Sequence, residues 1–517
     1  MPPVWLYLLG SRNAETDCAV VPSCPSISLV RELAILSLVK HLAIPFRREP
    51  YPTAPLSGLP QFLLEAAVMK QKKTSKKKPM RLPKHLEHLN ACAAGIDVGS
   101  KSHFVAVPDG ADPEPVREFS TFTDDLERLA DWLISCGVTT VAMESTGIYW
   151  IPVFEILESR GIEVKLVNAC HVKNVPGRKS DVLDCQWLQQ LHTYGLLRGA
   201  FRPADQVVAL RAYVRQRATL VKISGSHIQH MQKAMAQMNL QLHNVVSDIT
   251  GVTGMRIIKA ILAGERDANK LAAFRDNRCK NDAKTIARSL HGNYRPEHLF
   301  SLQQAVELYE FYLAKIGECD RQILAQLQAF DAKNSEGSFG GGKPPASLEE
   351  ALMRMSGVDL TDIDGINTAS AVKIIAEIGI DMSRWKTDKH FTSWMALAPG
   401  AKISGGKVLS SATKKIANRA AQAFRMAAYG LARSKSALGA YFRRQKARLG
   451  APKAITATAR KLATIVYAML KNGTCYNDLG QDYYEERYQS RLLQNLKRKA
   501  KHLGFELTPT GGEIVGS

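Results

Sequence analysis

The chain has 517 residues, which is room for two to four domains and a sizeable core. Its formal net charge of +21 and its pI near 9.5 indicate a polyanionic partner, with nucleic acid ahead of an anionic membrane surface. The sequence lacks any run of about 18 apolar residues, which excludes a bilayer-spanning helix. Nine scattered cysteines without a CxxC spacing argue for a reducing cytoplasm and against a zinc site.

Residues 1–92 carry no sustained hydrophobic period, and prolines interrupt them repeatedly, so we assign them no fold and expect disorder. Within this stretch, residues 70–84 hold eight basic residues and no acidic one. Such a run indicates either a flexible arm that binds the phosphates of a nucleic acid or a charged tail that only increases solubility. Translation starting at or near Met69 is a hypothesis that the composition suggests.

Residues 93–200 read as one α/β domain in the order βββαβαβα. The predicted strands are Ala93–Val98, Ser102–Val107, Val116–Thr121, Val138–Met143 and Glu163–Val167. The predicted helices are Asp124–Ser135, Tyr149–Ser159 and a third that opens at Ser180.

Four acidic residues stand out in this domain. Asp97 lies in the first strand, Glu144 stands at the carboxyl end of the fourth, and Asp181 and Asp184 share one face of the last helix. A converging set of carboxylates repels itself unless a cation neutralises it, and hard oxygen ligands suit Mg²⁺ or Mn²⁺. Two such ions roughly 3.5 to 4 Å apart can stabilise the attacking and leaving oxygens of a phosphoryl displacement. The alternative is that these are ordinary solvated or helix-capping acids.

Residues 203–333 read as a helical or coiled-coil domain. Two apolar stripes with three-four spacing, from Val207 to Leu242 and from Leu299 to Phe330, flank a shorter helical insert. Arg217 and Ser224 interrupt the first stripe, and Asp320 interrupts the second. The pattern fits an antiparallel hairpin, an oligomerising coiled coil or plain bundle core.

A Gly- and Pro-rich stretch at residues 334–347 reads as a linker, and residues 348–477 as a mainly helical basic domain. In it, Ile363–Gly379 is similar to a helix-hairpin-helix, in which Gly365 would turn backbone N–H groups toward a phosphate. Asn367 stands where that motif has a second glycine, so a plain helical hairpin remains open. Residues 478–517 are expected only as a tail.

The most one-sided charge lies between Lys389 and Asn477, with seventeen Lys or Arg and no acid. Such a segment repels itself without a polyanion. Here Ser404 could be a nucleophile beside a charge-neutralised phosphate or merely a hydrogen-bond donor, with Ser410 and Ser411 as rivals. The candidate nucleic-acid contacts around it are Lys402, Gly405, Gly406, Lys407, Lys414, Lys415, Arg419 and Arg425.

Four motifs in this order carry a family resemblance: GIDVGSK from Gly95, MESTGIYW from Met143, RKSDVLDCQWL from Arg178, and APGAKISGGK from Ala398. Together they resemble the DEDD-type insertion-sequence transposases of the IS-one-ten family, and the long helical insert is similar to its larger subgroup. Some relatives are bridge-RNA-guided recombinases. The resemblance covers roughly residues 93–475 and leaves the N-terminal segment without a counterpart.

This resemblance implies a RuvC-like RNase H fold, a coiled-coil middle and a C-terminal transposase domain. Asp97, Glu144, Asp181 and Asp184 match the metal-binding tetrad, and Ser404 matches the nucleophilic serine. It further implies DNA as donor and target, a guide RNA from the element, and a phosphoserine link to DNA. Family members work as dimers that pair into tetramers, with one subunit's acids facing another's serine. Sequence specificity would then rest on base pairing, as in other RNA-guided systems.

Two alternative functions remain open from the sequence. One is a RuvC-like nuclease or junction resolvase in which water attacks, and the other is a nucleic-acid-binding protein without chemistry. All readings place the protein in a bacterial or archaeal cytoplasm, associated with the nucleoid.

Overall fold

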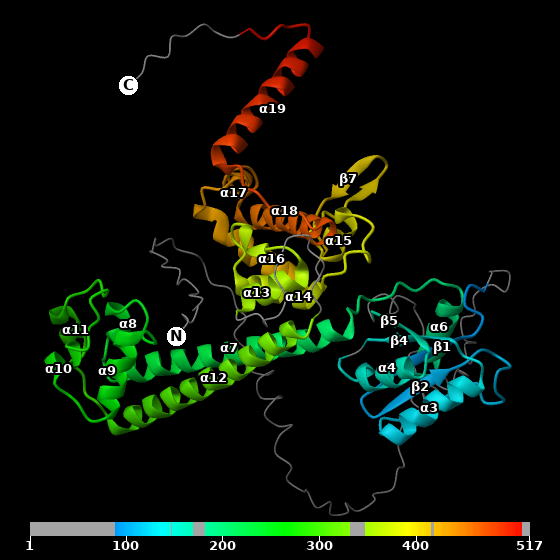
Figure 1. Ribbon diagram of the computed structural model, residues 1–517, viewed down its shortest axis with the longest axis horizontal. Coiled ribbons are helices and arrows are strands. Elements are labelled where there is room, and N and C mark those ends of the chain that lie inside the picture. The colour runs from blue at the N-terminus through cyan, green and yellow to red at the C-terminus, as the bar shows by residue number, and fades with distance from the viewer. Residues whose placement is uncertain (1–87, 146, 169–180, 331–346, 415–417, 509–517) are drawn as a thin grey trace, which may run out of the picture. The chain divides into compact units, whose positions relative to one another are not determined.

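The computed structural model describes residues 88–145, 147–168, 181–330, 347–414 and 418–508 (Figure 1). The chain divides into two units, Met1–Leu82 and Pro83–Ser517, and the described residues all belong to the second. The expected basic arm lies outside the described residues, and so does the expected linker at 334–347 except for its last residue, Ser347.

The first described domain is built on a five-stranded mixed sheet in the order β3-β2-β1-β4-β5. The strands are β1 (Ala93–Val98), β2 (Ser102–Ala106), β3 (Val116–Ser120), β4 (Thr140–Glu144) and β5 (Glu163–Val167). The first three pair antiparallel, whereas β1, β4 and β5 run parallel. The helices are α3 (Thr123–Ser135), α4 (Trp150–Ser159) and α6 (Asp181–Thr193). Each element lies within two residues of its prediction, and the mixed sheet is consistent with an RNase H-like fold.

Side-chain alternation gives the two faces of this sheet different roles. Ile96 of β1 and Met143 of β4 pack with α3 and α4 in one hydrophobic cluster. Ala142 points the other way and packs with Leu188 of α6. Strand β4, between β1 and β5, is buried along its whole length, as expected for a strand with parallel neighbours on both sides.

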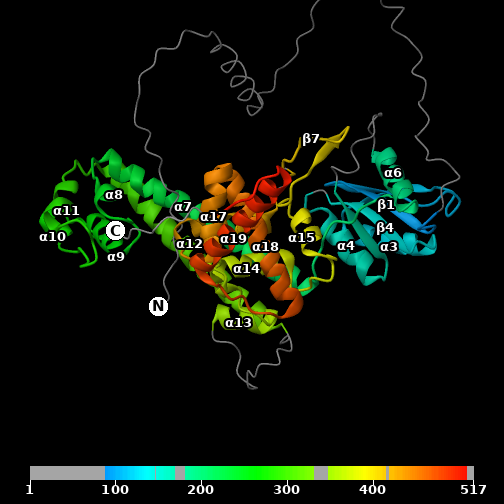
Figure 2. The same ribbon diagram turned by 90° about the horizontal axis from the view of Figure 1, so that it is seen from above.

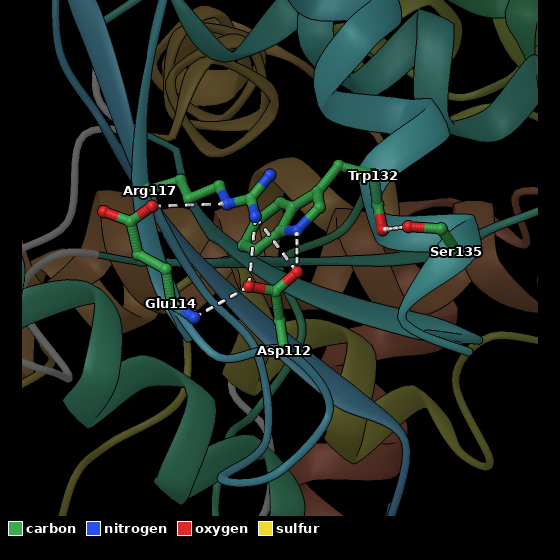
Figure 3. A network of polar contacts seen from close by, with 5 residues as sticks. All are labelled: Asp112, Glu114, Arg117, Trp132 and Ser135. Atoms are coloured by element: carbon green, nitrogen blue, oxygen red, sulfur yellow. Dashed lines mark hydrogen bonds and ion pairs between the residues drawn. The ribbon is translucent and has the colours of Figure 1, made fainter.

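A polar network fixes the turn between β2 and β3 against α3 (Figure 3). Asp112 accepts hydrogen bonds from the Trp132 indole at 3.0 Å, from Arg117 at 3.0 Å and from the Glu114 amide at 2.8 Å. The Arg117 guanidinium also lies 4.8 Å from the centre of the Trp132 ring. These bonds hold the pKa of Asp112 below its usual range, the Trp132 bond contributing most.

Two long helices follow, α7 (Asp205–Gln237) and α12 (Pro296–Gln328), which lie side by side in both views (Figures 1 and 2). They run antiparallel, because the Gln326 side chain near the end of α12 reaches the Gln206 carbonyl at the start of α7. Arg217 and Asp320, the two charged interruptions of the stripes, form a bidentate pair with each other. This pair favours one register of the two helices.

The two ends of this helical pair join different cores. At one end Met231 and Met235 pack with the short helices of the insert, which are α8 (Leu242–Val245), α9 (Val252–Leu262), α10 (Ala268–Ala272) and α11 (Ala283–Ser289). At the other end Val207, Leu210 and Leu327 share a core with the C-terminal helices. The insert is therefore a small helical unit at one end of the antiparallel pair formed by α7 and α12, which we call the stem.

The C-terminal part of the described chain is mainly helical. Its helices are α13 (Leu348–Ser356), α14 (Thr368–Ile378), α15 (Asp388–Trp394), α16 (Arg419–Gly430), α17 (Ala437–Leu449), α18 (Ala451–Asn472) and α19 (Gly480–His502). Its two strands, β6 (Lys402–Ser404) and β7 (Lys407–Ser410), form a hairpin. Among the described residues, no helix has the length and apolar character needed to cross a membrane.

Arginines on α7 join the stem to this C-terminal part. The half-buried Arg211 donates to the Ala376 and Glu377 carbonyls at the end of α14, at 3.0 and 2.9 Å. Arg215 makes a bidentate pair with the Glu377 carboxylate at 2.9 and 2.7 Å. Burial lowers the pKa of Arg211 to about 10, so it remains charged at neutral pH and complements the negative end of the helix.

Candidate functional site

Three of the four expected carboxylates meet at one end of the mixed sheet. Carboxylate oxygens of Asp97, Asp181 and Asp184 all lie within 4.8 Å of one another. Asp97 projects from β1, and the other two stand one turn apart at the start of α6. The site thus depends on how closely α6 lies against β1.

Gly95 explains that close approach. A methyl group there would lie 2.9 Å from the Gln189 Cα, and closer still to the Cys185 carbonyl oxygen and the Gln189 amide nitrogen. The Gln189 side chain donates to the Ala93 carbonyl at 3.2 Å, which ties α6 to β1 a second time. A glycine inside a strand often marks such a contact between backbones, so the signal was present in the sequence.

Gly95→Ala should displace α6 and separate Asp184 from Asp97. We expect a loss of about 1–3 kcal/mol in unfolding free energy, together with a clear loss of Mn²⁺ affinity. Denaturant unfolding and calorimetric Mn²⁺ titration measure the two effects. Gly225→Ala is the matched control, because a methyl group at that helical position meets no neighbouring atom within 4 Å. Mn²⁺ affinity equal to wild type in Gly95→Ala would contradict this role.

Glu144, the fourth acid, lies beside the other three without joining their group. The pairing of Ile96 with Met143 puts Glu144 next to Asp97 on the adjoining strand. Alternation directs it to the same face as Ala142, which is the α6 face. Glu144 is buried, at 8% exposure, and its carboxylate is not within the 4.8 Å group.

The electrostatics of this end of the sheet suit a cation. Asp97 and Asp184 are half-buried, Asp181 is exposed, and three carboxylates this close repel one another. The pKa of the neighbouring Cys185 thiol is raised to about 12, mainly because the thiol is buried and next because the Asp97 carboxylate is negatively charged. An all-oxygen set of this kind fits Mg²⁺ or Mn²⁺ and offers no soft ligand for zinc.

A buried histidine joins the far end of α6 to the start of β4. His192 is 1% exposed, and its Nε2 lies 2.9 Å from the Thr140 hydroxyl. Burial, with a smaller contribution from Lys165, lowers the pKa of His192 to about 4. The contact positions the helix that carries Asp181 and Asp184, and no pattern in the sequence predicts it.

The stability of this domain should therefore fall in acid. The unfolded chain protonates His192 near its ordinary pKa of 6.5, whereas the folded protein resists protonation until about 4. The stability that neutral His192 contributes is fully present above pH 6.5 and is lost as the pH falls toward 4. Over that range the free energy of unfolding should fall by at most about 1.4 kcal/mol per pH unit. His192→Gln should flatten this part of the curve of unfolding free energy against pH. An unchanged slope would show that other groups dominate.

Ser404 occupies the last position of β6, and its backbone pairs with Lys407. Gly405 and Gly406 between them have φ of +53° and +76°, the positive values that a two-residue type I′ hairpin turn needs. The glycines therefore build the turn that presents Ser404. Ser404 is exposed, whereas the rival Ser410 accepts a hydrogen bond from the Ala412 amide at 3.2 Å.

The other candidate contacts are mostly exposed. Lys402, Lys407, Lys414 and Arg419 are exposed, Arg425 is half-buried, and Lys415 lies outside the described residues.

Gly365 has a packing role that is visible in the structure. Its φ is +88°, and a methyl group there would lie 2.7 Å from the Ala427 carbonyl of α16. Asn367 caps α14 by accepting from the Ser370 amide at 2.9 Å, which accounts for its departure from the glycine of the motif. A phosphate contact at Gly365 stays a prediction.

A mixed sheet consistent with an RNase H-like fold, with three carboxylates where β1 meets α6, fits the class of metal-dependent nucleic-acid enzymes. Comparison with known families agrees: residues 94–240 match the DEDD transposase model of the IS110 type, and residues 359–443 match the transposase model of the IS116/IS110/IS902 family. No curated protein matches the chain. Both matches support an IS110-type DEDD transposase, the family that the sequence motifs resemble.

Proposed function

We propose that this transposase cleaves and exchanges DNA strands through a phosphoserine intermediate on Ser404, assisted by divalent ions. The observation that carries the proposal is the convergence of Asp97, Asp181 and Asp184 within 4.8 Å. These residues, with Glu144 beside them, would hold Mg²⁺ or Mn²⁺. When bound, the ions would neutralise the scissile phosphate and stabilise the charge on its attacking and leaving oxygens.

The serine step conserves the energy of the phosphodiester. The Ser404 Oγ forms a bond to phosphorus, its proton leaves to solvent or a nearby base, and the departing DNA oxygen leaves as a hydroxyl after protonation. A hydroxyl of another DNA strand then attacks the phosphoserine, which forms the new phosphodiester, breaks the bond from phosphorus to Ser404 Oγ and returns a proton to the serine. The step needs no ATP, and the exposed lysines 402 and 407 are suited to hold the DNA backbone near it.

We further propose that an element-encoded guide RNA selects donor and target DNA, and that the active unit is a dimer or tetramer in the cytoplasm near the nucleoid. The supporting feature is the segment from Lys389 to Asn477, whose seventeen cations and absence of acids suit backbone contacts to more than one nucleic acid. One subunit's acids would then act with another's serine.

Purification from cells that carry the element, followed by sequencing of bound RNA and incubation with element-end DNA, tests the proposal. We expect one transcript from the flanking DNA, and Mg²⁺-dependent cleavage that traps a protein–DNA adduct. If only random RNA fragments copurify, the proposal that an RNA guides the protein is wrong. If DNA is cleaved without a protein–DNA adduct, water and not Ser404 is the nucleophile. Binding without cleavage under any divalent ion would contradict the enzymatic function itself.

A further inference from the structure

The hairpin that presents Ser404 also carries aliphatic side chains that the proposed chemistry does not use. Ile403 is 65% exposed, Val408 62% and Leu409 69%. They are three of the seven residues of β6 and β7, and Ser410 alone in these two strands is partly buried. One exposed aliphatic residue is ordinary on a protein surface, whereas three on one small hairpin indicate a surface that another molecule covers.

The register of the hairpin separates these side chains onto two faces. Ile403 pairs with Val408, and Ser404 pairs with Lys407. Because paired residues share a face and successive residues alternate, Ile403 and Val408 lie on the face opposite to Ser404 and Lys407. The pairing skips Leu409, which makes it the extra residue of a bulge. The hairpin therefore has an aliphatic face and, behind it, a face that combines the serine with a cation.

The charge around the hairpin indicates the kind of molecule that covers it. Lys402, Lys407 and Lys414 are exposed, and the sequence from Lys389 to Asn477 holds no acid that could neutralise them. A second copy of the hairpin would bring lysines against lysines. DNA instead offers phosphates to the lysines and flat apolar base surfaces to the aliphatic side chains. The two faces of the hairpin thus match the two kinds of surface that a DNA strand has.

We propose that the β6–β7 hairpin holds the two strands of the substrate DNA apart at the scissile step. This inference rests on the proposed attack by Ser404, which requires the Ser404 face to lie against the backbone of the cleaved strand. The opposite face then points toward the partner strand, where Ile403 and Val408 cover a base that has lost its stacking neighbour. The two-residue glycine turn keeps the end of the hairpin narrow enough to enter between the strands.

Ile403→Thr/Val408→Thr tests strand separation, because threonine keeps the β-branched shape that favours a strand and removes the apolar surface. On a duplex that spans one element end, cleavage should fall by about tenfold or more, whereas mismatches at the scissile step should restore the wild-type rate. The matched control Ile403→Val/Val408→Ile keeps the aliphatic face and should cleave both duplexes as wild type does. Wild-type cleavage of the matched duplex by the threonine variant, or an equal loss on both duplexes, would overturn the proposal.

Fluorescence of 2-aminopurine at the scissile step tests the same claim without cleavage, because this base brightens when it leaves the stack. Ser404→Ala protein should raise the fluorescence on binding, and adding Ile403→Thr/Val408→Thr should abolish the rise at the same bound fraction. No rise with Ile403 and Val408 intact would overturn strand separation. A protein–DNA adduct that survives Ser404→Ala would instead overturn the serine chemistry, so the two failures are distinguishable.

Light-scattering mass without DNA tests the other possible occupant, a second copy of this chain. The threonine variant and the wild type should have the same mass, because DNA and not protein covers the aliphatic face. A lower mass of the threonine variant would assign Ile403 and Val408 to an interface between copies and overturn the proposal.

Discussion

Asp184→Asn should abolish divalent-ion binding at the acidic site and reduce DNA cleavage by at least about 100-fold. The three carboxylates within 4.8 Å are few enough that each is needed to hold an ion. The same change should stabilise the protein in EDTA, because it removes one of three mutually repelling charges. Mn²⁺ titration, thermal unfolding with and without EDTA, and cleavage of element-end DNA measure the three effects.

Asp124→Asn is the matched control for that experiment. Asp124 is an exposed acid in the first turn of α3, outside the cluster. It should leave ion binding and cleavage at the wild-type level, which separates loss of a ligand from loss of general negative charge. If Asp184→Asn still binds Mn²⁺ with wild-type affinity, the acids are not the ion site.

Ser404→Ala should eliminate the covalent protein–DNA adduct and lower strand exchange on the order of 10³-fold or more. Ser404 is held at the end of β6 by a glycine turn, so its loss should leave the hairpin and the rest of the fold intact. Denaturing gels of the protein incubated with labelled DNA show the adduct directly.

The rival serines supply the comparison. Ser410→Ala and Ser411→Ala should each keep the adduct, because Ser410 already supports a turn and neither sits at the hairpin tip. An adduct that survives Ser404→Ala and disappears in Ser410→Ala would move the nucleophile to the other strand of the hairpin.

The sequence predicts local elements well where one physical signal dominates. The sequence pattern located all five strands of the mixed sheet, but it did not predict the β6–β7 hairpin. The two charged residues that interrupt the apolar stripes, Arg217 and Asp320, pair with each other where α7 and α12 pack together. The interpretation of residues 478–517 as a tail missed α19, since a helix with no buried residue has a weak hydrophobic signal.

The sequence could not give the distances within the site. Asp181 and Asp184 are neighbours by helical spacing, but their approach to Asp97 depends on the backbone contact at Gly95. Glu144 lies next to Asp97 on the adjoining strand and points to the same face of the sheet. The position of its carboxylate depends on side-chain packing, which the hydrophobic pattern of the sequence does not predict. Thr140 and His192 meet only because β4 and α6 stack, 52 residues apart in the chain.

A structure of the protein bound to element-end DNA and Mn²⁺, with anomalous scattering recorded at the manganese edge, tests the central claim most directly. We predict manganese peaks in contact with the carboxylates of Asp97, Asp181 and Asp184, and a scissile phosphate that contacts both the ions and the Ser404 hydroxyl of one subunit. Manganese bound elsewhere, or a scissile phosphate beyond reach of every Ser404 in the assembly, would contradict it.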